Sequence, residues 1–191
     1  MEPLAVRIAT ADSVDVDELA KLAAHTFPMA CPPSVTADNI ASFIDAHLSE
    51  ARFGEYLADP ERLILVAAQG NRIIGYAMLV HGVGDDVHVH RAVGPHSAVE
   101  LSKMYVLSQY HGTGVSTALM DTALDSASGA DCVWLGVNQQ NQRAQRFYRK
   151  HGFTFNGTRT FRLGTRIEND YVMVRRLPRP TPAAGPCKRS P

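Results

Sequence analysis

The sequence has few cysteines, no long hydrophobic run and no excess of charge of either sign. Its cysteines, Cys31, Cys132 and Cys187, are scattered without a CxxC pair, which favours reduced thiols in a cytoplasmic protein over a disulfide framework. The 19 basic and 19 acidic residues cancel, so the basic excess typical of nucleic-acid-binding proteins is missing. The longest apolar run, 63–68, is far shorter than a membrane span. These absences predict no nucleic-acid partner and no membrane partner.

The composition is that of an ordinary globular chain, with 191 residues, 45% hydrophobic and 20% charged. The N-terminal stretch MEPLAVRIATADSVD has neither the basic region nor the apolar region of a signal peptide. We expect one domain over 1–177, because this length buries a core without staples. The segment 178–191 holds five of the eleven prolines, and we expect it to be a disordered tail.

Hydrophobic spacing predicts alternating strands and helices, the arrangement of an α/β chain. We expect helices over 13–27, 36–49, 115–124 and 141–151, the first capped by Asp12 or Ser13 and the second by Thr36 or Asp38. Residues 82–97 are expected to form a long loop. Strands are expected over 4–9, 62–69, 72–81, 98–107, 132–137, 153–163 and 166–177.

A glycine-rich turn, QYHGTGVSTALM at 109–120, separates an expected strand from an expected helix. Gly112 and Gly114 would let the backbone close round a phosphate, with amides and the positive end of the helix facing it. No lysine follows the glycines, which excludes a Walker P-loop. Thr117 stands at the third Rossmann glycine, and no acid ends the next strand. On the glycines alone, a plain strand–helix turn remains an equal alternative.

A second motif lies one strand further on, where Asn141, Ala144, Phe147-Tyr148 and Gly152-Phe153 are spaced along NQRAQRFYRKHGF. Together with the glycine-rich turn, it resembles the GNAT superfamily of N-acetyltransferases, and among them the PaiA-type polyamine N-acetyltransferases. The resemblance covers roughly Leu4 to Leu177. It implies an α/β (α+β) GNAT fold with a mixed, mostly antiparallel sheet of about seven strands, splayed centrally, and helices on both faces.

The resemblance also implies acetyl-CoA as co-substrate, lying in the splay between the strands 98–107 and 132–137. Backbone groups of Met104, Tyr105 and Val106 would pair with the pantetheine amides. Asn141 would contact the pantetheine arm, and it could also cap its own helix. Many family members have a third glycine where this chain has Ser116, whose amide can still donate. The pyrophosphate would be held by the turn and the helix start, namely Gln109, Tyr110, His111, Gly112, Thr113, Gly114, Val115 and Ser116.

Two side chains are candidates for catalysis. Tyr148 could protonate the departing CoA thiolate as a general acid, and the alternative is that it only packs against the sheet. Glu100, at the start of the strand leading to the cofactor, could take a proton from the acceptor ammonium, directly or through water. The alternative for Glu100 is an exposed acid at a strand end.

Histidines at 81, 88, 90 and 96 accompany Asp85 and Asp86 in and beside the expected long loop. Their i,i+2 spacing on an irregular segment is not a recognised zinc set, so we expect no metal. We expect instead a solvated loop that faces the acceptor site and whose acidic pair attracts a cationic amine.

The acceptor implied by the resemblance is a primary amine, such as the polyamine spermidine, with a protein or peptide amine as the alternative. Two other functions stay open: a regulatory acyl-CoA-binding protein without turnover, and a nucleotide-binding module. Family members are often dimers, so a homodimer is a further expectation.

Overall fold

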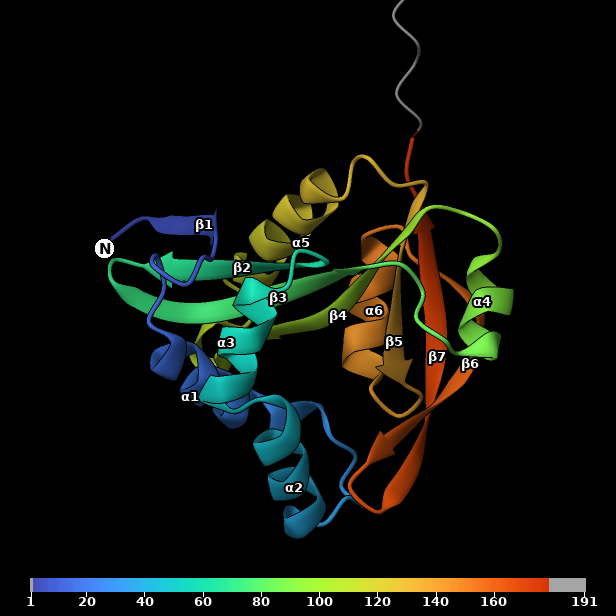
Figure 1. Cartoon of the computed structure of the whole chain (residues 1–191), viewed down its shortest axis with the longest axis horizontal. Coiled ribbons are helices and arrows are strands. Elements are labelled where there is room, and N and C mark those ends of the chain that lie inside the picture. Colours follow the sequence, from blue (N-terminus) through green and yellow to red (C-terminus); the bar gives the residue numbers. More distant parts are fainter. Residues whose placement is uncertain (1, 179–191) are drawn as a thin grey trace, which may run out of the picture.

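The computed structural model describes residues 2–178 and shows an open, seven-stranded sheet (Figure 1). Its strand order is β1-β2-β3-β4-β5-β7-β6, and every neighbouring pair except the parallel pair β4–β5 is antiparallel. The expected tail therefore lies outside the described residues, apart from Pro178. The strands are β1 (Leu4–Ile8), β2 (Arg62–Gln69), β3 (Arg72–His81), β4 (Ala98–Val106), β5 (Cys132–Asn138), β6 (Thr154–Leu163) and β7 (Arg166–Arg176).

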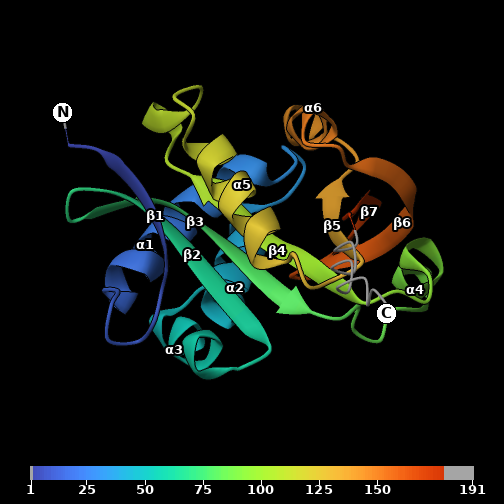
Figure 2. The same cartoon turned by 90° about the horizontal axis from the view of Figure 1, so that it is seen from above.

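Helices cover both faces of this sheet (Figure 2). Helix α5 lies over β2, β3 and β4 on one face, whereas α1 and α3 pack against β3 and β2 on the other. The mixed, mostly antiparallel sheet with helices on both faces confirms the predicted fold class. The helices are α1 (Val16–Thr26), α2 (Ala37–His47), α3 (Glu50–Ala58), α4 (Val87–Val93), α5 (Val115–Ser126) and α6 (Gln142–Lys150), with short 3-10 turns η1 (Phe27–Ala30) and η2 (Ser108–Tyr110).

The sheet is splayed between β4 and β5, as predicted. Only the register pairs from Ala98–Cys132 to Glu100–Trp134 join these strands, although β4 continues to Val106 and β5 to Asn138. A register shift opposite Met78 and Leu79 leaves Ser102 without a partner on β3, so β4 carries a bulge where the splay opens. Beyond Glu100, the backbone groups on the facing edges of β4 and β5 are therefore not paired with each other and can bind a ligand.

Two helices differ from the sequence-based expectations. Helix α3 was not predicted; its start is capped by Ser49, whose side chain accepts from the Arg52 amide, and it buries Phe53 and Tyr56. Helix α4 replaces the middle of the expected loop, because Asp86 accepts from the amides of His88 and Val89 and caps it.

The caps of the two predicted N-terminal helices are also settled. The first is capped by Asp15, whose side chain accepts from the Glu18 amide, so the expected cap at Asp12 or Ser13 was wrong by two or three residues. The second is capped by Thr36, which accepts from the Asn39 amide, so Thr36 is confirmed over Asp38.

The buried residues form a large core and a small one. The large core lies between the sheet and the helices α1, α2, α3 and α5. The small one places Val89 and Val93 of α4 against Trp134, Val172 and Val174 of β5 and β7. Because α4 packs against this second core, the segment 82–97 lies away from the splay.

Candidate active site

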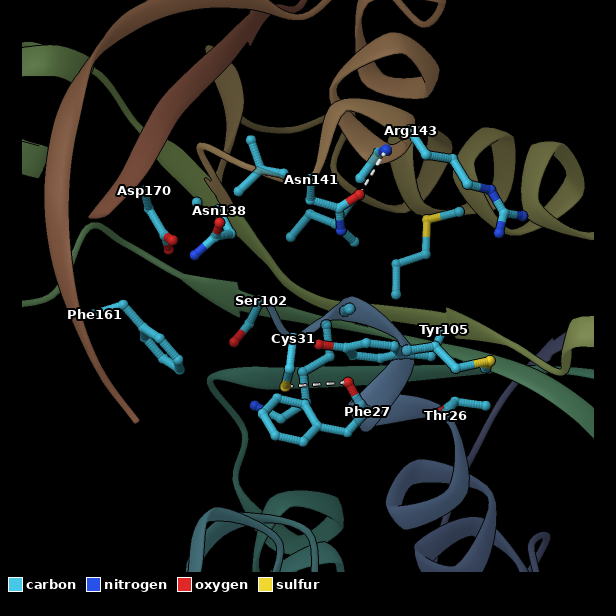
Figure 3. A pocket seen from close by; sticks show the side chains of 18 of the residues that line it. Thr26, Phe27, Cys31, Ser102, Tyr105, Asn138, Asn141, Arg143, Phe161 and Asp170 are labelled. Carbon is cyan, nitrogen blue, oxygen red and sulfur yellow. Dashed lines mark hydrogen bonds between the residues drawn. The ribbon is translucent and has the colours of Figure 1, made fainter. Parts of the chain in front are cut away.

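A cavity of about 430 Å³ opens at the splay between β4 and β5 (Figure 3). One part of its wall comes from β4, α6 and the start of α5, and the other from the segment after α1, from α2, and from β6 and β7. Eight of the sequence-predicted site residues line it: Glu100, Met104, Tyr105, Val106, His111, Ser116, Asn141 and Tyr148. The six that do not line it are Gln109, Tyr110, Gly112, Thr113, Gly114 and Val115.

The glycine-rich turn is shaped by two positive φ angles, 81° at Gly112 and 93° at Gly114. A Cβ at either position would meet nothing within 4 Å, so the backbone angle rather than crowding requires glycine. The amides of Tyr110, His111 and Thr113 donate to carbonyls within the turn itself. The expectation that the amides of this turn face a phosphate is therefore wrong for these three amides.

The start of α5 nevertheless keeps unsatisfied donors. Gly114 is its N-cap residue and supplies no side-chain cap. Within residues 2–178, the amides of Gly114, Val115 and Ser116 donate no hydrogen bond. Helix N-termini with free amides attract anions, and the ring of His111 bonds the Val106 carbonyl at 2.9 Å, tying this turn to the end of β4.

Gln109 points elsewhere. It lines a separate cavity of about 280 Å³ together with Glu18, Lys21 and His25 of α1. The structure therefore does not bring the Gln109 side chain together with the other predicted cofactor residues.

Helix α6 contributes Asn141 and Tyr148. The Asn141 Oδ1 accepts from the Ala144 amide at 3.1 Å and caps the helix, while the residue also lines the cavity (Figure 3). The Tyr148 ring packs against Phe153, with the two ring centroids 5.9 Å apart, and the residue lines the cavity. Burial raises the pKa of its hydroxyl to about 12, so it stays protonated at neutral pH and can act as a proton donor.

Glu100 occupies the last paired position before the splay and is largely buried. The alternative of an exposed acid at a strand end was therefore wrong. Its Oε1 lies 3.4 Å from Nη1 of Arg159, whose Nε lies 3.5 Å from Oδ2 of Asp170. One guanidinium thus bridges two carboxylates that both line the cavity.

Gly136 of β5 makes room for this guanidinium. A Cβ there would stand 2.2 Å from Nη2 of Arg159, and the Cζ of the same guanidinium lies 5.3 Å from the centroid of the Trp134 ring. A further carboxylate of the wall, Glu168, is buried and accepts from Nε of Arg166 at 3.1 Å. Burial raises the pKa of Asp170, and Arg159 partly opposes this rise.

Three of these charged residues, Arg159, Glu168 and Asp170, were missed in the sequence. Glu168 and Asp170 flank the exposed Asn169 and are both buried on β7, and that i,i+2 pair of acids in a closing strand was the available signal. Lys103 of β4 also lines the cavity, and burial lowers its pKa to about 8 against the opposing effect of Glu100.

The segment with the histidines does not face the cavity. No residue of 82–97 lines it, and α4 packs against β6 and β7 instead. Asp86 is used as a helix cap, and the His90 ring bonds the Gly84 carbonyl at 2.8 Å. The expectation of an acceptor-facing loop was therefore wrong. Across residues 2–178 we find neither a group of three or more potential metal ligands nor a helix able to cross a membrane.

Comparisons with known proteins agree with this geometry. Residues 19–153 match the acetyltransferase (GNAT) family. An uncharacterized N-acetyltransferase of Mycobacterium tuberculosis (strain ATCC 25618 / H37Rv) is 60% identical over 165 residues, which cover 85% of this chain and 98% of the relative.

Two solved structures share the fold at low identity. The PaiA N-acetyltransferase from Thermoplasma acidophilum, in complex with coenzyme A, has a TM-score of 0.70 at 18% identity, covering 91% of this chain and 99% of that one. Arabidopsis thaliana NAA60, in complex with a bisubstrate analogue, has a TM-score of 0.68 at 15% identity, covering 92% and 98%. The predicted resemblance is confirmed: the chain belongs to the GNAT family and is an N-acetyltransferase.

Proposed function

We propose that this protein transfers the acetyl group of acetyl-CoA to a primary amine by direct attack in a ternary complex. The observation that carries the proposal is the cavity at the splay, which joins a strand edge without a partner, free amides at the start of α5 and the Tyr148 hydroxyl. The similar fold of the PaiA N-acetyltransferase, solved with coenzyme A, supports the choice of donor.

The donor is held mainly by backbone groups. The pantetheine arm pairs with the edge formed by Met104, Tyr105 and Val106, which have no strand partner on the β5 side. The pyrophosphate binds at the turn, where the amides of Gly114, Val115 and Ser116 are free. Gln109, Tyr110, His111, Gly112 and Thr113 shape this turn, and Asn141 meets the arm from α6.

The reaction moves two protons. Glu100 takes one from the acceptor ammonium, directly or through water, and the free amine nitrogen attacks the thioester carbonyl carbon. When the carbon–sulfur bond breaks, Tyr148 gives its proton to the thiolate of CoA. The second proton leaves the nitrogen as the amide forms and restores the Tyr148 hydroxyl, and Glu100 returns its proton to solvent.

The acceptor is a cationic amine in this proposal, because Glu100, Glu168 and Asp170 place carboxylates in the wall. The polyamine spermidine is one candidate, from the PaiA resemblance. A peptide amine is the other, since NAA60 of similar fold was solved with a bisubstrate analogue.

The test is release of the CoA thiol from acetyl-CoA with spermidine, hexylamine and short peptides, comparing the parent protein with Tyr148→Phe. We expect the variant to lose roughly 10²–10⁴-fold in kcat while its affinity for CoA is unchanged. Tyr171→Phe is the matched control, because Tyr171 contacts Phe155 and does not line the cavity.

Two results would contradict parts of the proposal. Turnover that survives Tyr148→Phe would remove Tyr148 as the acid and leave the enzyme class standing. Binding of acetyl-CoA with no release for any amine would favour the alternative of a regulatory acyl-CoA-binding protein.

A further inference from the structure

We propose that the acceptor is a primary amine with a single positive charge on an apolar body, its ammonium bound by Asp170 and its body by an aromatic wall. This inference rests on the proposed function and narrows its substrate class. It favours a monoamine over a polyamine. It follows from the side chains of one part of the cavity, which we call the acceptor half and which is lined by Phe27, Phe43, Phe161, Glu100, Glu168 and Asp170.

The apolar part of that half is built from phenylalanines of three separate elements. The Phe27 and Phe43 rings are stacked with centroids 4.4 Å apart, and Phe161 meets Phe43 edge-on at 5.5 Å. Phe161 is only partly buried, and its side chain faces the cavity opposite Ser102 (Figure 3). Met29 extends the wall and is 49% exposed. Such a surface gains free energy by covering an alkyl or aromatic group, and a polyamine covers it less fully because ammonium groups that must stay hydrated interrupt or end its methylene chains.

The charges of the same half are balanced before any acceptor enters. Three carboxylates, those of Glu100, Glu168 and Asp170, line it. Against them stand Arg159, which bridges Glu100 and Asp170, Arg166, which bonds Glu168, and Lys103, which lines the cavity. A second or third ammonium group would therefore find no unpaired carboxylate and would lie beside existing cations. Burying a positive charge in that setting costs free energy.

Asp170 is the carboxylate best placed for the one ammonium. It is 5% exposed, and its side chain points into the cavity on the side of Phe161 and Asn138 (Figure 3). Among the described residues, Arg159 is the only cation within ion-pair distance, and that contact is long at 3.5 Å. A carboxylate oxygen accepts more than one hydrogen bond, so Asp170 can receive the ammonium without releasing Arg159.

The test compares hexylamine with 1,6-diaminohexane, which have the same carbon chain and differ by one terminal ammonium group. The measurement is kcat/KM from CoA-thiol release at pH 7. We expect kcat/KM to be higher for hexylamine by about tenfold or more. The second ammonium of 1,6-diaminohexane must either be buried without a partner or stay in water, and in the second case the carbon chain loses its contact with the aromatic wall. A peptide amide that begins with Met-Ala is a further arm, since a peptide N-terminus can carry the same single charge and apolar group.

Variants assign the two contacts. Phe161→Ala should lower kcat/KM for hexylamine by about tenfold, whereas Phe161→Leu keeps most of the activity. Phe155→Ala is the matched control on the same strand, since Phe155 is 57% exposed and does not line the cavity. Asp170→Asn should raise KM for hexylamine more than it lowers kcat.

The outcomes separate this inference from the proposed function. The inference is overturned if kcat/KM for 1,6-diaminohexane or spermidine equals or exceeds that for hexylamine, or if a folded Phe161→Ala variant keeps its kcat/KM. Either result is compatible with the proposed amine acetyltransferase. Preference for the Met-Ala peptide over hexylamine supports the same chemistry with a peptide as its source. No turnover with any amine overturns both.

Discussion

Lys103 is held in a place where its charge is poorly solvated. Its Nζ lies 5.7 Å from the centroid of the Tyr56 ring, and burial is the main reason that its pKa falls to about 8. Arg62, Arg159 and Arg52 lower this pKa further, while Glu100 acts in the opposite direction. The folded protein therefore carries this ammonium at neutral pH at a cost in stability.

The pH dependence of that cost can be predicted. In the unfolded chain the Lys103 pKa returns toward its usual value of 10.5. Between about pH 8 and pH 10.5 the unfolded chain then binds more protons than the folded one, so the free energy of unfolding rises with pH in this window. Lys103→Met should be more stable than the parent at pH 7, by on the order of 1–3 kcal/mol, and this advantage should shrink as the pH approaches 10.5.

Urea unfolding at pH 7 and pH 10 measures this difference. Lys150→Met is the matched control, because Lys150 is exposed near the end of α6 and should show no such dependence. A Lys103→Met variant that is less stable than the parent at pH 7 would mean that the contacts with Tyr56 and Glu100 outweigh the desolvation of the ammonium.

Among the predicted site residues, those that belong to the motif of helix α6, which fixes both sequence and backbone, line the cavity, and their roles stay predictions. Asn141 and Tyr148 are three and ten positions beyond Asn138, where β5 ends, on a helix whose start is set by the Asn141 cap, and both line the cavity. Arg159 and Asp170 face the same cavity because β6 and β7 pair beside β5, a contact over distance in the chain that no local pattern encodes. Gly136 shows the same limit, since its need for glycine depends on the side chain of Arg159.

At the scale of elements, the N-cap of helix α6 stabilises the helix, and the proposed function gives the same residue a second role in cofactor binding. The Asn141 side chain satisfies the Ala144 amide, and the proposed function adds a contact from its amide group to the pantetheine arm. Asn141→Ala should cost about 1 kcal/mol of stability and weaken CoA binding. Asn141→Ser keeps a capping oxygen, so it should recover the stability and not the affinity.

Thermal unfolding and CoA titration of the two variants separate the two roles. If serine restores CoA binding along with stability, the contact with the pantetheine arm is absent and Asn141 acts only as a cap. If neither variant changes the stability, the Asn141 cap contributes little to it, and the expected cost of about 1 kcal/mol for Asn141→Ala is wrong.

Elements were predicted well where hydrophobic periodicity was long and poorly where it was short. The seven strands and the helices α1, α2, α5 and α6 follow the sequence pattern within a few residues. Helix α4 has seven residues, and its stability comes from Val89 and Val93 packing on Trp134, Val172 and Val174 of distant strands. Helix α3 carries Gly54 in its middle, which weakens its helix propensity. Its buried residues Phe53 and Tyr56 depend on tertiary packing, since Phe53 contacts Tyr76 of the distant strand β3.

At the scale of the whole molecule, the splay divides the sheet. The strands β1 to β4 and the strands β5 to β7 meet through the short ladder between Ala98–Glu100 and Cys132–Trp134. The cavity at this junction is lined from both sides, by Met104 and Tyr105 of β4 on one and by Val137 and Asn138 of β5 on the other. A ligand seated there adds contacts between the two parts that the free protein lacks.

Binding at this junction should therefore raise the stability of the entire fold. At acetyl-CoA concentrations about 100 times its Kd, linkage predicts roughly 2.7 kcal/mol of added stability. For a domain of this size, that corresponds to an increase in Tm of about 5–10 °C. ATP and NAD are the matched controls, because the turn lacks the lysine of a P-loop and β5 ends at Asn138 rather than at an acid. A Tm raised by ATP or NAD and not by acetyl-CoA would instead identify a nucleotide-binding module, and the splay would have to be assigned to a different ligand.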